Sequence, residues 1–262
     1  MDLARPDLAP EPGLSREKME RLQREVASAA AFADDLGVDP AAVGLADQPT
    51  VSGERPVVVG VDQAFLDDRA VSAVVAMRGG EVVERVHAVS ELTIPYVPGL
   101  LSFREGGPIL DAVRELAVEP DLALFDGSGR IHFRQAGLAT HMGVVLDVPS
   151  VGVAKSLLCG RPAEDVDGRP AGWRTPILPD ADVEARSDDD PETFAETPIG
   201  YAYQSRQYDS EPIVNPLYVS PGHRVSATTA VDVVARLCDR YKLPEPTRLA
   251  DTYADEVKRA YG

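Results

Sequence analysis

VVVGVD, residues 57–62, is an apolar run that ends in an aspartate, and LALFDGSG, residues 122–129, repeats this arrangement. Each run is too short for a helix and is typical of a buried strand. In an open α/β sheet, groups just beyond the carboxyl ends of strands face the crevice where ligands bind. If the two strands are neighbours that point the same way, Asp62 and Asp126 lie side by side at that edge.

The segments around these strands predict a mixed sheet flanked by helices. Residues 71–77 and 82–89 are two more apolar stretches joined by a glycine turn, which predicts an antiparallel three-strand meander with 57–61. The chain then alternates between helix 102–118, strand 122–125, helix 134–146 and strand 150–154. Antiparallel strands followed by a β-α-β-α segment indicate a layered α/β domain.

Outside this core the patterns are weaker. Residues 1–13 are rich in proline and charge and are expected to be disordered, whereas 15–36 have the apolar spacing of an amphipathic helix. The other segments are a polar connector at 38–55, an acidic surface excursion at 160–197, a hairpin from 199–205 and 213–219, and a helix at 226–241. We therefore expect an N-terminal tail and helix, 1–55, packed on one domain, 56–262, which carries the acidic insert.

The composition excludes several classes of protein. The chain has 262 residues, with 26 Lys and Arg against 43 Asp and Glu, a formal net charge of −17 and only four lysines. This acidic, arginine-rich composition suggests adaptation to concentrated salt, which screens repulsion between surface charges. The sequence has no apolar run near the roughly 20 residues that cross a bilayer, no signal-peptide pattern and too few cysteines for a disulfide framework. We expect a cytoplasmic protein that does not enter a membrane.

Three carboxylates are candidates for a metal site. A like-charged pair such as Asp62 and Asp126 is unfavourable unless a cation lies between them, and hard oxygen ligands favour magnesium or manganese. Glu105 is the third carboxylate. The alternatives are that each aspartate simply caps a turn, and that Ser102-x-x-Glu105 is a helix capping box in which Glu105 bonds only backbone amides.

An aromatic, a lysine and a histidine residue are further candidates for the site. The stiff Pro-x-x-Pro loop at 95–98 carries Tyr96 and suits a wedge between stacked bases, although packing on its own domain explains its composition slightly better. Lys155 directly follows the 150–154 strand, which suits a phosphate contact or a transition-state cation. His223 precedes the 226–241 helix and is a candidate general acid or base, or else a turn histidine.

Six motifs follow one another along the chain: GVDQAF (60–65), PYVPGLLSFRE (95–105), DGSGRIHFRQAGLATHMG (126–143), VGVAK (151–155), NPLYVSPGHRVS (215–226) and LPEPTRLAD (243–251). In this order they resemble the motifs of endonuclease V, the deoxyinosine-directed repair nuclease. The resemblance runs from about residue 57 to 251. It implies a ribonuclease-H-like fold with an acidic site at the strand edges, which agrees with the pattern-based prediction.

The resemblance implies a role for each matching residue. Asp62 and Asp126 fall on the Mg²⁺ ligands, with Mn²⁺ as a substitute, and Glu105 is the third acid, acting through a water. Lys155 and His223 fall on the catalytic lysine and histidine. The lesion-binding positions are Pro95, Tyr96 as the wedge, Val97, Pro98, Gly99, Leu101, Gly127, His132, Gly137 and Leu138. The family usually has proline where this chain has Phe133, which puts the local loop shape in question.

The implied activity is hydrolysis of the second phosphodiester bond 3′ to a deoxyinosine in DNA, leaving 3′-hydroxyl and 5′-phosphate ends, by a monomer. The sequence leaves open whether inosine-containing RNA is also cut, because that depends on tolerance of a 2′-hydroxyl. The net charge of −17 argues against a nucleic-acid partner, so we expect Arg104, Arg130, Arg134 and Arg224 to form a local positive lining. Two alternatives are another ribonuclease-H-like nuclease, such as a junction resolvase, and a non-catalytic module that binds cations or a protein partner.

Overall fold

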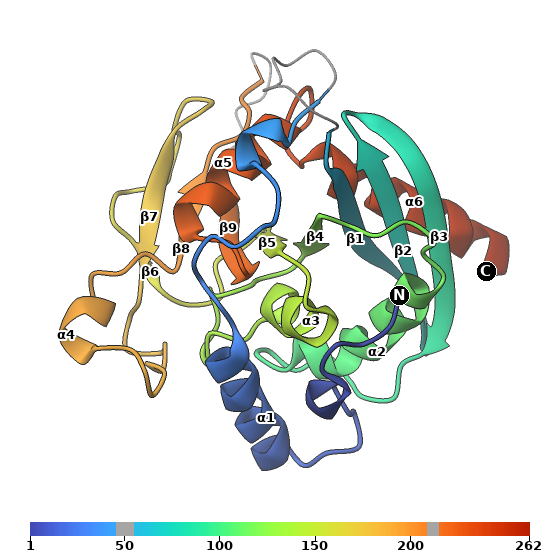
Figure 1. Cartoon of the computed structure of the whole chain (residues 1–262), viewed down its shortest axis with the longest axis horizontal. Helices are drawn as coiled ribbons and strands as arrows, with labels where there is room; N and C mark the ends of the chain where they lie inside the picture. Colours follow the sequence, from blue (N-terminus) through green and yellow to red (C-terminus); the bar gives the residue numbers. More distant parts are fainter. Residues whose placement is uncertain (46–54, 209–214) are drawn as a thin grey trace.

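The apolar run at 57–62 lies in the middle of a mixed sheet (Figure 1). The computed structural model describes residues 1–45, 55–208 and 215–262. Within these residues the sheet has nine strands in the order β3-β2-β1-β4-β5-β9-β8-β7-β6. They are β1 (Val57–Leu66), β2 (Arg69–Arg78), β3 (Glu81–Glu91), β4 (Leu122–Asp126), β5 (Ser150–Ala154), β6 (Arg161–Pro162), β7 (Arg174–Leu178), β8 (Gly200–Tyr203) and β9 (Leu217–His223).

The two strands that carry the aspartates lie side by side and point the same way. β1 pairs in parallel with β4, with Val61 opposite Phe125, and β4 pairs in parallel with β5. β1, β2 and β3 form the antiparallel meander. These pairings confirm the predicted mixed α/β sheet, and they bring Asp62 and Asp126 to the same edge of it.

Alternation of side chains along β1 gives the sheet two apolar faces. Val57, Val59 and Val61 pack on one face with α1, α2 and α3. Val58 packs on the opposite face with α5, and α6 covers β1 and β2 there. The helices are α1 (Arg16–Ala29), α2 (Leu101–Arg114), α3 (Leu138–Leu146), α4 (Pro191–Phe194), α5 (Ala227–Leu237) and α6 (Glu245–Tyr261). The strand edge that carries the aspartates therefore lies between two helical layers.

The first thirteen residues are ordered, so the expectation of disorder is wrong. They contain a 3-10 helix, η1 (Pro6–Leu8), in which Leu8 is buried. The backbone amide of Ala4 donates to the carbonyl of Val145, and the imidazole of His141 donates to the carbonyl of Leu8. Composition does not report such contacts, because they join the segment to residues more than a hundred positions away.

The acidic insert at 160–197 is part of the sheet, which corrects its interpretation as a surface excursion. It supplies β6, β7 and α4, and β7 pairs antiparallel with β8. Ile177 and Phe194 of the insert pack with Ile131 in a small separate core. β6 and β7 are two and five residues long, and β7 contains Pro176, so the sequence offers no run long enough to show a strand period.

The remaining differences concern the ends of elements and one missed helix. The strand predicted at 57–61 continues to Leu66, so Asp62 lies inside β1 and not just beyond its end. The helices predicted at 15–36, 102–118 and 226–241 end earlier, at Ala29, Arg114 and Leu237, and the one predicted at 134–146 begins at Leu138. The sequence prediction has no counterpart of α6. β8 and β9 form the predicted hairpin, although residues 46–54 of the connector and 213–214 of the predicted strand lie outside the described residues. Across residues 1–45, 55–208 and 215–262, no helix is long and apolar enough to span a bilayer.

A glycine in β1 lets α6 approach the sheet closely. A Cβ atom on Gly60 would lie 2.0 Å from the carbonyl carbon of Pro246 and 2.5 Å from the amide nitrogen of Thr247. Both are backbone atoms, which cannot rotate away, so only glycine fits this position. The first turn of α6 therefore packs directly against β1 at Gly60, which lies two residues before Asp62.

Gly60→Ala is expected to destabilise the protein through overpacking, which typically costs about 1–3 kcal/mol. In thermal unfolding followed by circular dichroism, the melting temperature should fall by about 2–10 °C. Gly107→Ala is the matched control, because Gly107 lies within α2 and a Cβ there meets no atom within 4 Å. Its melting temperature should hold or rise, since alanine favours a helix. Equal losses in both variants would contradict the contact between α6 and Gly60.

Candidate active site

A cleft of about 410 Å³ lies where β4 ends beside β1, which continues past Asp62 to Leu66. It brings together the three predicted acids, Asp62 from β1, Asp126 from β4 and Glu105 from α2, with Tyr96 at its rim. The other lining residues are Val61, Gln63, Phe65, Leu101, Arg104, Ile109 and Leu138. A single cleft therefore contains acidic, aromatic and apolar side chains from segments far apart in the sequence.

Asp62 is a buried carboxylate whose charge is poorly compensated. Its Oδ1 accepts a hydrogen bond from the Gln63 amide at 2.7 Å, whereas its Oδ2 is buried and finds no partner among the described residues. Burial, and then the neighbouring Asp126 charge, raise the pKa of Asp62 to about 8. Such a pair of like charges favours either a shared proton or a cation placed between the two groups.

Glu105 also faces the cleft, and it is not a capping residue. α2 begins at Leu101, so Ser102 lies inside the helix, where its hydroxyl donates to Nδ1 of His141 at 2.9 Å. The Glu105 carboxylate accepts a hydrogen bond from the neighbouring Arg104 guanidinium at 3.4 Å. Burial raises the pKa of Glu105 to about 7, opposed by Arg104 and helped by the Asp126 charge. The capping-box alternative is therefore wrong for this residue.

Two groups from neighbouring elements complete the charge pattern. Lys155, directly after β5, places its Nζ 2.8 Å from Oδ2 of Asp126. Burial works against the charged amine, but the charges of Asp126, Asp62 and Asp251 together outweigh it and raise the pKa of Lys155. The charge of Asp251, on α6, raises the pKa of both Asp62 and Lys155. Asp251 lies in the motif LPEPTRLAD, but because the sequence patterns did not predict α6, they did not place Asp251 beside the other acids.

The carboxylates fit a divalent cation, although they are not already grouped around one. In the part of the chain that the structure describes, no set of three or more His, Cys, Asp or Glu side chains is arranged closely enough to hold a metal ion. The ammonium group of Lys155 instead donates a hydrogen bond to Oδ2 of Asp126. The unpartnered oxygen of Asp62, its raised pKa and the purely carboxylate donor set still suit magnesium or manganese better than a soft metal.

His223 does not lie in this cleft. It is the last residue of β9 and pairs with Ser150, the first residue of β5, at the opposite edge from Lys155. Its Nδ1 accepts from the Ala31 amide at 3.2 Å and its Nε2 contacts Asp147 at 3.3 Å. This position supports the turn-histidine alternative and gives no support to the predicted role in acid–base catalysis.

The lesion-binding positions are divided between the cleft and its walls. Leu101 and Leu138 line the cleft, and Tyr96 is 62% exposed at its rim. The carbonyl of Gly99 is occupied by His132, which is buried. The glycines allow close packing of the loop after β4, because a Cβ atom would lie 2.4 Å from the Ser128 carbonyl at Gly137 and 3.2 Å from the Leu138 side chain at Gly127.

The arginines predicted to form a positive lining are mostly engaged elsewhere. Arg104 lines the cleft and lies over the ring of Phe65, at 4.7 Å from the ring centroid. Arg130 and Arg134 are largely buried in contacts with the insert and with α1. Arg224 pairs with Asp35 and Asp147. The positive groups that the structure brings to the acids are thus Arg104 and Lys155.

Comparisons with known proteins identify the family and the fold. The family model of Endonuclease V matches residues 42–252. The Endonuclease V of Natronomonas pharaonis is 57% identical over 262 residues, covering 100% of this chain and 99% of that protein. The crystal structure of Endonuclease V from Streptomyces avermitilis, at 32% identity, superimposes with a TM-score of 0.72 and covers 98% of both chains.

A further structure is similar in fold alone. It is Ciona intestinalis Endonuclease V in complex with a 24mer DNA containing an inosine followed by a ribo-adenosine, with a TM-score of 0.69, 22% identity, and coverage of 94% of this chain and 98% of that chain. The mixed sheet and these likenesses confirm the ribonuclease-H-like fold. The match over most of its length shows that this chain belongs to the Endonuclease V family.

Proposed function

We propose that this nuclease recognises deoxyinosine in DNA and hydrolyses the second phosphodiester bond on its 3′ side with the help of Mg²⁺, leaving 3′-hydroxyl and 5′-phosphate ends. The observation that carries the proposal is the joint placement of Asp62, Asp126 and Glu105 in one cleft with Tyr96 at the rim. Carboxylates at that edge suit metal-assisted phosphodiester hydrolysis, and an exposed tyrosine beside them suits recognition of a displaced base.

Inosine is a physically reasonable lesion for such a site. An inosine pair is weaker than a normal pair, so turning its base out of the duplex costs less, on the order of a few kcal/mol at most. The inosine-containing DNA bound by the Ciona protein supports the same substrate class here. Tolerance of a 2′-hydroxyl decides whether inosine-containing RNA is also a substrate, so both kinds of strand belong in the assay.

The proposed reaction uses the residues of the cleft as follows. Asp62 and Asp126 hold the divalent ion, which when bound supplies a Lewis acid for the scissile phosphate and the leaving 3′ oxygen. Glu105, with a pKa raised to about 7 by burial, positions the attacking water and accepts its proton near neutral pH. Lys155 offsets the charge that develops on the phosphoryl oxygens. His223 has no part in this reaction, because it lies at the other edge of the sheet.

We also propose that the protein acts as a monomer in the cytoplasm. Within the described residues, both cysteines, Cys159 and Cys238, are free thiols, which suits a reducing compartment. The acids, the tyrosine and the lysine of the site all come from one chain, so catalysis does not require a second copy.

Asp126→Asn is expected to lower nicking of inosine-containing DNA by more than about 100-fold, because it removes a charge needed to hold the metal ion. Binding to the same DNA without metal should stay within a few-fold of the native protein. The control is Asp255→Asn, an exposed carboxylate on α6 that should leave nicking unchanged. Gel assays of nicking and metal-free binding measure both effects. Undiminished nicking by Asp126→Asn would remove this residue from the mechanism.

Tyr96→Ala is expected to weaken discrimination between inosine and adenosine strands about tenfold to a hundredfold, as stacking of a base on an aromatic ring is worth about 1–3 kcal/mol. Fluorescence anisotropy on paired DNA duplexes measures the discrimination. Because Tyr96 is 62% exposed, the melting temperature should not change. Tyr261→Ala, which removes a tyrosine of 51% exposure near the C-terminus, is the control. Unchanged discrimination in Tyr96→Ala would exclude a wedge.

The raised pKa values predict a pH-dependent response to Mg²⁺. Asp62 and Glu105, with pKa values of about 8 and 7, keep protons in the folded protein that the unfolded chain releases above about pH 4. The metal-free protein therefore loses stability from these groups as pH rises from about 4 to 8. Mg²⁺ bound by Asp62 and Asp126 must displace the proton of Asp62, so the gain in melting temperature on adding it should be larger at pH 9 than at pH 6. Asp62→Asn should remove most of this difference, and a gain independent of pH would contradict the assignment.

A further inference from the structure

The loop that carries Tyr96 is held at its last residue. The carbonyl of Gly99 accepts two hydrogen bonds, one from Nε2 of Gln23 at 2.8 Å and one from Nε2 of His132 at 3.1 Å. Gly99 has a φ of +77°, which favours glycine, and a Cβ atom there would lie 2.8 Å from the ring of Phe133. The two donors to this carbonyl therefore hold the end of the loop, three residues from Tyr96.

Gln23 reaches the loop from α1, 76 residues away in the sequence. Its side chain is fully buried, at 0% exposure, and both ends of its amide are used. The Oε1 atom accepts from Nε of Arg134 at 2.9 Å, while Nε2 donates to Gly99. A flipped amide would set oxygen against oxygen and hydrogen against hydrogen, so these two partners fix its orientation.

His132 supports the same carbonyl as a donor with a fixed tautomer. Its Nδ1 accepts from the Arg134 backbone amide at 3.2 Å, so the proton is on Nε2 and points at Gly99. Burial, and then the charge of Arg134, lower the pKa of His132 to about 3. The ring is therefore neutral near physiological pH and acts as a fixed support for the loop, with no exchangeable charge to offer to catalysis.

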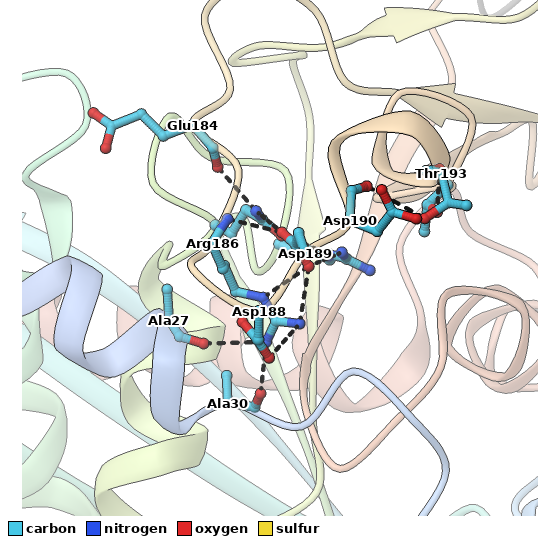
Figure 2. Close-up of polar contacts among 11 residues, drawn as sticks. Ala27, Ala30, Glu184, Arg186, Asp188, Asp189, Asp190 and Thr193 are labelled. Atoms are coloured by element: carbon cyan, nitrogen blue, oxygen red, sulfur yellow. Dashed lines mark hydrogen bonds and ion pairs between the residues drawn. The ribbon is translucent and has the colours of Figure 1, made fainter.

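α1 is in turn fastened to the acidic insert. Figure 2 shows Arg186 of the insert donating to the carbonyls of Ala27 and Ala30, where α1 ends. One helical turn before Ala27, Arg24 makes a two-pronged ion pair with Glu184 of the insert, at 2.7 and 2.9 Å. These contacts fix the position of the helix along the domain, and with it the position of the Gln23 amide.

The side chains of the loop contact the rest of the domain through apolar packing. Val97 and Ile94 pack with Met19 of α1 and with Phe103 of α2 in a small cluster. Such packing keeps the loop on the domain but does not set its orientation, because apolar contacts tolerate small rotations. The two hydrogen bonds to Gly99 are directional and do set it.

We propose that Gln23 is a positioning residue for lesion recognition: by donating to the carbonyl of Gly99, it holds the 95–99 loop so that Tyr96 stands at the rim of the acidic cleft. The inference rests on the proposed function of Tyr96 as a wedge. It gives α1 and the acidic insert a shared role, since the insert fastens the helix and the helix fastens the loop. The simpler alternative is that Gln23 only anchors α1 to the domain.

The test compares three variants. Gln23→Leu removes both hydrogen bonds of the amide, and Gln23→Glu keeps an acceptor for Arg134 while removing the donor to Gly99. Val26→Ala is the control, because Val26 is fully buried on the same helix, in a core cluster that does not include the loop. This control destabilises α1 through a cavity and leaves the Gln23 amide in place. All measurements are made at pH 8 and at one salt concentration, so that the introduced glutamate is ionised.

Two readouts separate a positioning role from a structural one. Hydrogen exchange of residues 95–101 in the DNA-free protein should become about threefold to tenfold faster in both Gln23 variants, the change expected for loss of one buried hydrogen bond. Metal-free discrimination between inosine and adenosine strands should fall by a similar factor. Val26→Ala should lower the melting temperature and leave both readouts at their native values.

Other results would overturn the inference. If the Gln23 variants lower only the melting temperature, or if Val26→Ala loosens the loop equally, then Gln23 is an anchor of α1 and nothing more. If Gln23→Glu matches the native protein in both readouts, the donation to Gly99 has no role. A native protein that fails to discriminate inosine would refute the proposed function instead, and the exchange measurement would still decide whether Gln23 holds the loop.

Discussion

Repulsion between Asp62 and Asp126 is the interaction on which the rest of the site depends. The parallel pairing of β1 with β4 leaves these carboxylates no choice of position, because Val61 and Phe125 are opposite each other and the aspartates come next. The sheet therefore places the buried carboxyl group of Asp62 beside the half-buried carboxylate of Asp126, an arrangement that a protein would avoid for stability alone. Burial, and then the neighbouring Asp126 charge, raise the pKa of Asp62, while Lys155 forms a salt bridge to Asp126.

Close backbone approaches keep this pair in place. Gly60 lets α6 lie against β1, which brings Asp251 toward the other acids. Gly152 allows a second close approach, in β5. A Cβ atom there would lie 2.4 Å from the amide nitrogen of Gly129 and 2.5 Å from the carbonyl oxygen of Gly127. The loop after Asp126 thus folds directly over β5. Side chains at these two strand positions would separate the elements that carry the charges.

Sequence patterns predicted the central strands of the fold correctly, but they did not predict the structure of its N-terminal segment and its insert. Strand runs that end in aspartate identified the edge of the sheet, because strand pairing and the position of the acids follow from a local pattern. The N-terminal segment and the insert depend on distant partners, such as Val145 for Ala4, which no local pattern reports. His223 was misplaced for a related reason: β9 runs antiparallel to β5, so the end of β9 lies at the edge away from Lys155.

The distribution of arginine also explains how so acidic a chain can serve a nucleic-acid substrate. Arg24 pairs with Glu184 of the insert, Arg134 with Glu20 of α1 and Arg186 with Asp189 of the insert. Their charges are compensated within the protein, so they add little to the attraction of DNA. In concentrated salt, counterion release contributes little to binding, and long-range repulsion is screened within a few ångströms. Under the proposed function, recognition rests on short-range contacts: stacking on Tyr96, charge from Lys155 and Arg104, and a cation held by the acids. An interface of this kind needs its loop fixed in advance more than it needs a basic surface, because short-range contacts are lost when a side chain is displaced by even a small distance.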